Sequence, residues 1–151
     1  MDFFDRLVRL ETDLWNAVER ELLGRDQVGL GTLQALRVVA RHDGSARVQD
    51  LSRELSITIG AASKMVDRLE RDGLASRRAH PQDRRSSLVA LTDSGQRAGR
   101  TGERVARAVV ADLLGDAEDL ATLLAGIDRL QARLDSHTAG ATAGVTAGVR
   151  A

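Results

Sequence analysis

The chain has 151 residues, 22 basic and 22 acidic side chains, and no cysteine. This length can bury a core in one domain without disulfide or metal support, and the lack of cysteine excludes disulfides and thiol catalysis. There is no run of 18 apolar residues and the first residues are acidic and amphipathic, so we expect a cytoplasmic protein without a membrane span or signal peptide. Aromatic residues make up only 2% of the chain, which favours helices over a large sheet.

The neutral total hides an uneven distribution of charge. Residues 58–100 carry 9 basic and 5 acidic side chains, whereas residues 1–57 carry 8 and 10, and residues 101–135 carry 4 and 7. A basic segment between two acidic ones suggests one binding face for a polyanion.

Two helices are expected at the start of the chain. Apolar residues three and four positions apart predict an amphipathic helix over residues 2–23, which Gly24 should end. A second helix should follow Gly31 and end near Gly44.

Two short helices and a hairpin should come next. The helices are expected over residues 48–55 and 58–72, with Thr58 as the N-cap of the second because its hydroxyl can accept a free backbone N–H. The β-prone runs LASRRAH and SLVAL flank the polar run PQDRRS, which predicts a hairpin with a long tip.

A long helix should then begin at Thr92 and end at Gly115, and Asp116 should cap a last helix that reaches Leu134. Three glycines interrupt the long helix: Gly95, Gly99 and Gly102. Each costs about 1 kcal/mol relative to alanine in a helix interior. They indicate either a close backbone approach to a neighbour or only a weak first turn. Residues 136–151 repeat Thr-Ala-Gly and are expected to form a flexible tail.

This order predicts a mainly α fold with a small β-hairpin. Three helices followed by a two-stranded hairpin over residues 31–95 are typical of a winged helix-turn-helix. The helices at residues 1–24 and 105–135 carry more apolar surface than so small a body can cover. We expect a single domain over residues 1–135.

The segment 58–72 divides into two faces at 100° per residue. The face expected to be buried consists of Ile59, Ala62, Met65, Val66 and Leu69. The opposite face begins with small residues, hydroxyls and the only lysine of the chain, Lys64. Small side chains let a helix enter a groove, its N-terminus attracts phosphate, and Ser63 and Lys64 can donate hydrogen bonds to base edges. The alternative is a solvated helix with an idle polar face, and the position directly before an arginine-rich hairpin favours DNA binding.

Four arginines crowd into the hairpin: Arg77, Arg78, Arg84 and Arg85. A narrow minor groove attracts arginine through its negative potential, so DNA contacts are expected here, first of all from Arg85. Asp83 should orient an arginine through a bidentate pair. The alternative is a surface loop of a chain that uses arginine almost to the exclusion of lysine.

Residues 51–95 resemble the core of MarR-type transcriptional regulators, the multiple antibiotic resistance regulator family. The matching marks are Ser-Lys and then Asp-Arg-Leu-Glu in the predicted helix over 58–72, Asp-Gly-Leu before the hairpin, Asp-Arg-Arg at its tip, and Leu-Thr-x-x-Gly at the start of the next helix. The number and order of the flanking helices match as well, so the resemblance covers about residues 1–135.

The resemblance implies a homodimer with interlocked terminal helices (1–24 and 105–135) that binds a pseudo-palindromic operator in double-stranded DNA, more often as a repressor. Its groove-facing or phosphate-facing positions are Thr58, Gly60, Ala61, Ser63, Lys64 and Arg68. It places Arg85 at the wing arginine of the minor groove and Asp83 at the carboxylate that braces the wing. Many members release DNA when a small effector binds between the dimer helices and the winged helix, and Trp15 is the candidate for such a site here. The cysteine through which some relatives sense oxidants has no counterpart.

Two other classes of function fit the sequence less well. The three histidines are scattered, and no metal-ligand spacing, nucleophile motif or phosphate loop is present, so we expect no enzyme, cofactor or metal. A winged helix used only for protein–protein contact is the runner-up, although it would not need the arginine-rich hairpin.

Overall fold

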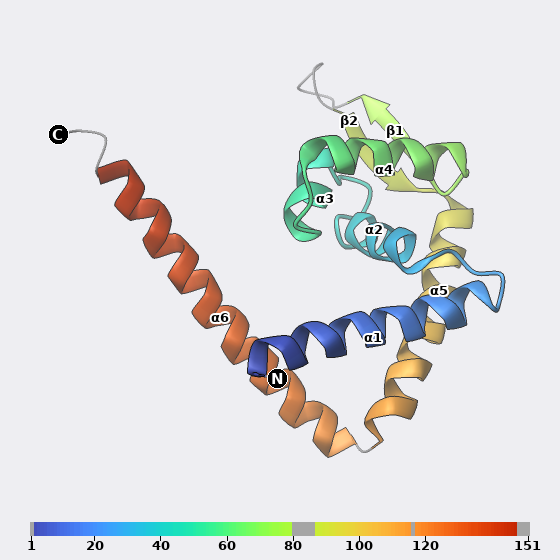
Figure 1. The fold of residues 1–151 in the computed structure, drawn as a ribbon. Helices are drawn as coiled ribbons and strands as arrows, with labels where there is room; N and C mark the ends of the chain where they lie inside the picture. Colours follow the sequence, from blue (N-terminus) through green and yellow to red (C-terminus); the bar gives the residue numbers. More distant parts are fainter. Residues whose placement is uncertain (1, 80–86, 116, 148–151) are drawn as a thin grey trace. The chain divides into compact units, whose positions relative to one another are not determined.

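The computed structural model describes residues 2–79, 87–115 and 117–147 (Figure 1). Its elements are, in chain order, α1 (Phe3–Leu23), α2 (Leu30–Arg41), α3 (Val48–Glu54), α4 (Ile59–Arg71), β1 (Ala75–Ala79), β2 (Ser87–Leu91), α5 (Asp93–Leu114) and α6 (Ala117–Ala147). The mainly α fold with one hairpin is confirmed. The chain divides into two compact units, Met1–Val110 and Ala111–Ala151, so the single domain expected over residues 1–135 stays a prediction.

Helix α4 begins and ends as its sequence predicts. Thr58 is the N-cap, and its hydroxyl accepts the backbone N–H of Ala61 at 3.2 Å. After the C-cap Asp72, Gly73 takes a φ of +67°, which glycine adopts without steric cost. In the first unit α4 lies across the top of the body in Figure 1, with α2 and α3 beneath it.

The core of the winged part lies between α2, α3, α4 and β2. Its largest fully buried side chains are Leu36, Val38, Val39, Leu51, Val66, Leu69 and Val89. Ala62, Val66 and Leu69 confirm the predicted buried face of α4, and Met65 is half-buried. Ile59 corrects it, because this side chain is 52% exposed. The apolar periodicity of a helix predicts which face is apolar, but it does not show whether another element packs on that face. Ile59 is the first residue of α4, and the core does not extend far enough to cover it.

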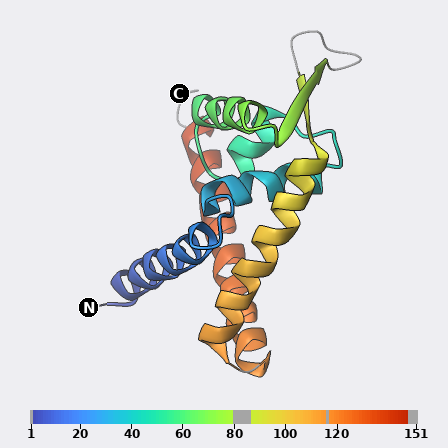
Figure 2. The ribbon, with the colours of Figure 1, turned by 90° about the vertical axis from the view of Figure 1, so that its right-hand side faces the viewer.

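The hairpin is antiparallel, with a register that runs from Ala75 opposite Leu91 to Ala79 opposite Ser87. A third segment joins it, because Val89 N–H donates to the carbonyl of Ala46 at 2.7 Å. Figure 2 shows the hairpin beside α4, with its strands running away from the helical body. The tip, which contains Asp83, Arg84 and Arg85, lies outside the described residues.

The glycines of α5 favour the close-approach alternative. A Cβ atom on Gly95 would lie 1.9 Å from the carbonyl oxygen of Leu74, and one on Gly102 would lie 3.0 Å from Cδ1 of Leu33. Gly99 is less restricted, since its nearest neighbour would be 3.8 Å away. The base of the hairpin and the body therefore pack directly on the backbone of α5.

Gly24 ends α1 as expected, in a right-handed conformation with a φ of −65°. Two details differ from expectation. Helix α2 begins at Leu30 instead of after Gly31, because the Glu19 carboxylate of α1 accepts the Leu30 N–H and satisfies the helix N-terminus. The predicted tail is also wrong in part, since α6 continues to Ala147. Alanine has the best helix propensity, and extending an existing helix needs no new nucleus.

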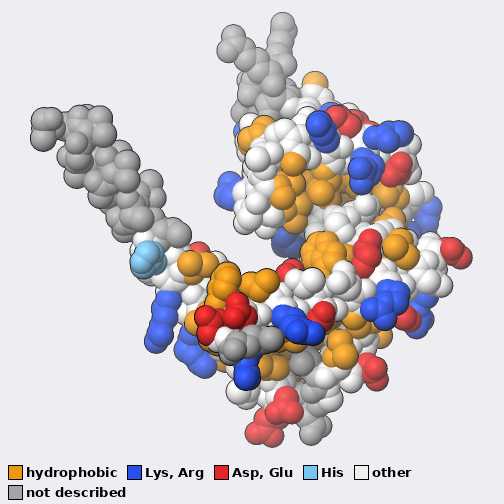
Figure 3. Space-filling view, in the orientation of Figure 1, with side chains coloured by type: hydrophobic (Ala, Val, Ile, Leu, Met, Phe, Trp, Pro, Cys, Tyr) orange, Lys and Arg blue, Asp and Glu red, His pale blue; other side chains and the backbone are white. Residues whose placement is uncertain are grey.

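Helices α1 and α6 each expose an apolar stripe. In α1 the exposed large side chains are Phe3, Phe4, Leu7, Val8, Leu10, Trp15 and Leu23. In α6 they are Leu123, Leu124, Ile127, Leu130 and Leu134. Figure 3 shows hydrophobic side chains at the surface of each helix. Among the described residues, no helix is long and apolar enough to span a membrane.

Candidate nucleic-acid-binding surface

The exposed face of α4 holds the residues that the sequence singled out. Thr58, Gly60, Ala61, Lys64 and Arg68 are exposed, and Ser63 is half-buried. A Cβ atom on Gly60 would meet nothing within 4 Å, so the start of α4 is open to an approaching molecule. Within the described part of the chain, neither Lys64 nor Arg68 forms an ion pair. Figure 3 shows basic side chains over this helix. The face combines little side-chain bulk, free cations and the positive end of a helix.

The arginines of β1 differ from one another in their surroundings. Arg78 is exposed and forms no ion pair among the described residues. Arg77 instead donates from Nη1 to Glu70 at 2.5 Å and to Asp67 at 2.7 Å, and its side chain is 27% exposed. Burial by itself would lower the pKa of Arg77, but the hydrogen bonds to Asp67 and Glu70 outweigh it and raise the pKa. Arg77 therefore stays charged, and its charge forms ion pairs with two acidic residues of the protein itself.

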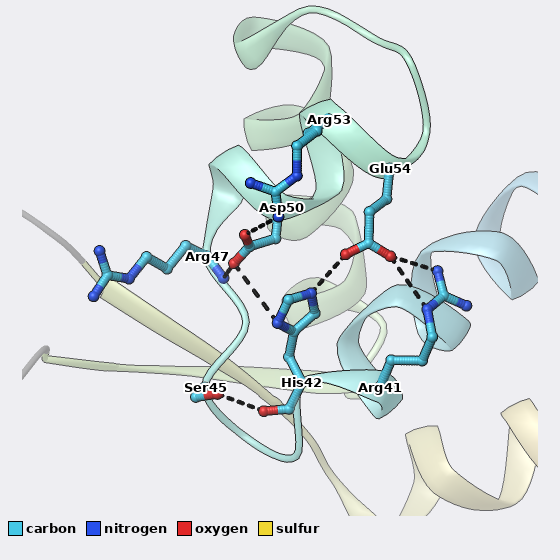
Figure 4. Close-up of polar contacts among 7 residues, drawn as sticks. All are labelled: Arg41, His42, Ser45, Arg47, Asp50, Arg53 and Glu54. Atoms are coloured by element: carbon cyan, nitrogen blue, oxygen red, sulfur yellow. Dashed lines mark hydrogen bonds and ion pairs between the residues drawn. The ribbon is translucent and has the colours of Figure 1, made fainter. Parts of the chain in front are cut away.

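A polar cluster fixes α3, the first helix of the helix-turn-helix, to the end of α2 (Figure 4). His42 Nε2 lies 2.6 Å from Oε1 of Glu54, and Arg41 donates to the other oxygen of Glu54 at 2.7 Å. Hydrogen bonds from His42 and then from Arg41 lower the pKa of Glu54. Asp50 accepts the Arg47 N–H at 2.9 Å and lies 4.0 Å from His42 Nδ1.

Sequence reasoning missed this cluster and the two acids around Arg77. Asp50 and Glu54 stand four positions apart, as residues on one face of a helix do, and that spacing was the available signal. Asp67 and Glu70 gave a similar signal, since they lie three positions apart and directly precede the basic strand.

A cavity of about 540 Å³ lies between the end of α2, the hairpin and α5. Its apolar wall includes Leu36, Val39, Ala90 and Leu91, and its charged lining residues are Arg37, Asp43, Arg78, Arg100 and Glu103. Arg37 lies 3.9 Å from Glu103, whereas Arg78 and Arg100 have no ion-pair partner in the described ranges. Trp15 does not line this cavity; it lies on α1 and is 40% exposed.

Taken together, the elements α2 to α4, the hairpin and the open basic face of α4 define a winged helix-turn-helix protein. Residues 32–87 match the model of the MarR family, so this part of the chain is similar to that family. Two curated relatives that it matches are named as HTH-type transcriptional regulators.

Individual proteins are similar to the chain in sequence or in fold. The uncharacterized HTH-type transcriptional regulator YwhA of Bacillus subtilis (strain 168) is 31% identical over 61 residues, which are 40% of this chain and 43% of that protein. The chain thus spans less than half the length of that relative. Among solved structures, a mutant of MarR from E. coli complexed with operator DNA superposes with a TM-score of 0.74 at 22% identity, covering 86% of this chain and 99% of that one. CouR from Rhodococcus jostii RHA1 bound to p-coumaroyl-CoA gives a TM-score of 0.74 at 21% identity, covering 86% and 90%. At these identities the structures show the fold.

Proposed function

We propose that the protein is a transcriptional regulator that binds a pseudo-palindromic operator as a homodimer, as a repressor whose affinity for DNA falls when a small effector binds. Helix α4 is called the recognition helix from here on, and one observation on its exposed face carries the proposal. This face offers Gly60 and Ser63, together with Lys64 and Arg68, which have no ion-pair partner among the described residues. The hairpin adds the exposed Arg78. Small residues allow entry into the major groove, and the cations suit base edges and phosphates.

The homodimer is supported by the apolar stripe of α1. Side chains such as Phe3 and Phe4, which are 66% and 68% exposed, remain in solvent in the single chain. A soluble protein rarely leaves so large an apolar helix face uncovered, and a second copy of the same helix would cover it symmetrically. A dimer would also present two recognition helices to successive turns of the duplex.

The cavity beside the hairpin is the site where we place the effector. Arg78 and Arg100, which have no ion-pair partner in the part of the chain that the structure describes, favour an anionic ligand, and Leu36 and Val39 offer an apolar wall to the rest of the molecule. Because Arg78 belongs to the hairpin, a ligand bound there would alter the position or charge of the wing. Trp15 stays a candidate for the ligand site only if α1 of a second copy contributes to it.

The decisive experiment is selection of bound DNA from a random duplex library, followed by titration at several salt concentrations. We expect an enriched inverted repeat, and a log-log salt dependence whose slope is about −0.9 for each phosphate neutralised. Lys64→Ala should alter the preferred base at specific positions and cost about 1–3 kcal/mol. Arg104→Ala, which removes an exposed arginine of α5, is the matched control and should leave selection unchanged.

The protein–protein module predicts a different result. In that case no sequence would be enriched, residual binding would be weak and equal for all duplexes, and Lys64→Ala would behave like Arg104→Ala.

A further inference from the structure

We propose that Arg77 is a positioning residue, which holds the wing against the recognition helix and offsets part of the negative charge of two of its carboxylates, and is not itself a DNA contact. The proposal rests on the proposed DNA binding, and it removes one of the four hairpin arginines from the expected DNA-contacting set. Three residues, Arg77, Glu70 and Asp67, are called the wing clasp below.

Glu70 accepts two hydrogen bonds from Arg77, one from its backbone and one from its side chain. One carboxylate oxygen accepts the backbone N–H of Arg77 at 2.8 Å, and the other accepts its guanidinium at 2.5 Å. Asp67, one helical turn earlier on α4, binds the same Nη1 atom at 2.7 Å. Because both acids belong to the recognition helix and Arg77 belongs to β1, these bonds set the position of the hairpin relative to that helix.

The backbone bond has a specific place in the sheet. Arg77 faces Val89 in the register, and each directs its N–H away from the other strand, Arg77 toward Glu70 and Val89 toward Ala46. Glu70 thus occupies the outer edge of β1 at this position, where another strand would otherwise pair. Arg78, the next residue, is exposed and has no such contact with any described residue.

The clasp also changes the charge that DNA would meet. Asp67 is 53% exposed and lies on the same face of α4 as Gly60 and Lys64. Unpaired, its carboxylate would repel the phosphates that this face is proposed to approach. Pairing with Arg77, whose charge Glu70 shares, reduces this repulsion, because the Nη1 atom of Arg77 lies within hydrogen-bond distance of both carboxylates.

The test compares two neighbouring arginines of the same strand in the full-length chain. Arg77→Gln and Arg78→Gln should each weaken operator binding by roughly tenfold. Arg78→Gln should also reduce the steepness of the salt dependence by about 0.9, as expected for one lost phosphate contact. Arg77→Gln should leave this slope unchanged. A slope reduced equally by both substitutions would overturn the proposal.

A second arm of the experiment tests directly whether Arg77 offsets the negative charge of Asp67. Adding Asp67→Asn to Arg77→Gln should recover part of the lost affinity, since the unpaired carboxylate is then gone. If Arg77 contacted phosphate, removing Asp67 could not replace that contact, and an unchanged or lower affinity of the double variant would contradict the clasp. If Arg77→Gln does not fold, Arg77→Lys takes its place, with one bond to the acids expected to be lost.

A third arm needs no DNA and so separates this proposal from the proposed function. In the free protein, amide hydrogen exchange at Arg77 should accelerate at least tenfold in Glu70→Ala, because its acceptor is removed, and should be unchanged in Arg78→Gln. Absence of operator binding by the wild type would refute the proposed function, while unchanged exchange in Glu70→Ala would refute the clasp.

Discussion

The same substitution, glycine to alanine, should have opposite effects at two helical positions of this protein. At Gly95 the new Cβ atom would lie 1.9 Å from the carbonyl oxygen of Leu74, so the backbone must move by more than 1 Å to reach an ordinary contact distance. That carbonyl accepts the N–H of Thr92 at 3.1 Å, and the Thr92 hydroxyl in turn accepts the N–H of Gly95 at 3.0 Å. Movement at Gly95 therefore strains the whole junction between the hairpin and α5.

The expected magnitude follows from three contributions. Overpacking costs about 1–3 kcal/mol, and a weakened hydrogen bond at the junction costs about 1 kcal/mol. Better helix propensity returns about 1 kcal/mol. Gly95→Ala should thus lower the free energy of unfolding by about 2 kcal/mol. Gly60→Ala meets nothing within 4 Å and should raise it by up to about 1 kcal/mol.

Urea unfolding followed by far-ultraviolet circular dichroism measures both effects. The protein concentration must be equal for all variants, because association would add to the stability. Equal stability of Gly95→Ala and the wild type would refute the close approach of Leu74, and with it the reason given for glycine at this position.

Further expectations concern the helix-turn-helix. Ser56 holds a φ of +53°, so Ser56→Gly should stabilise the fold by roughly 0.5–1 kcal/mol in the same urea assay; no gain would show that its side chain compensates the strain. Thr58→Ala should cost about 1 kcal/mol by removing the N-cap of α4, and an unchanged midpoint would contradict that role. The pKa of Glu54 is lowered from 4.5 in the fold by His42 and Arg41, so its contribution is complete above that pH and disappears as the pH falls through the lowered value. Glu54→Gln should accordingly lose less stability than the wild type between pH 5 and pH 3, in thermal melts, and parallel curves would refute the linkage.

The sequence predicted what depends on local patterns. The apolar period placed α1 to α4, Thr58 and Gly73 marked the ends of the recognition helix, and the β-prone runs around PQDRRS placed the hairpin. These features depend on residues close together in the chain, so a linear reading reaches them.

The remaining features depend on contacts between distant residues. Nothing local shows that Glu19 satisfies the first N–H of α2, or that the core leaves Ile59 uncovered. In the candidate site, charge density alone could not separate Arg77, which two acids hold, from Arg78, for which the described residues supply no ion pair. The roles of Arg84, Arg85 and Asp83 stay predictions, since these residues lie outside the described ones.

The bond between Val89 and Ala46 has a consequence for the order in which the protein folds. It joins the second hairpin strand to the connection between α2 and α3, two segments far apart in the sequence. Contacts within single helices can form early, because they close short loops. The hydrogen bond between Val89 and Ala46 closes a much longer loop, so it forms only after the intervening chain has become compact. We therefore expect the base of the hairpin to dock after α3 and α4 have formed. A nascent chain would then acquire its helices before it acquires a complete surface for nucleic acid.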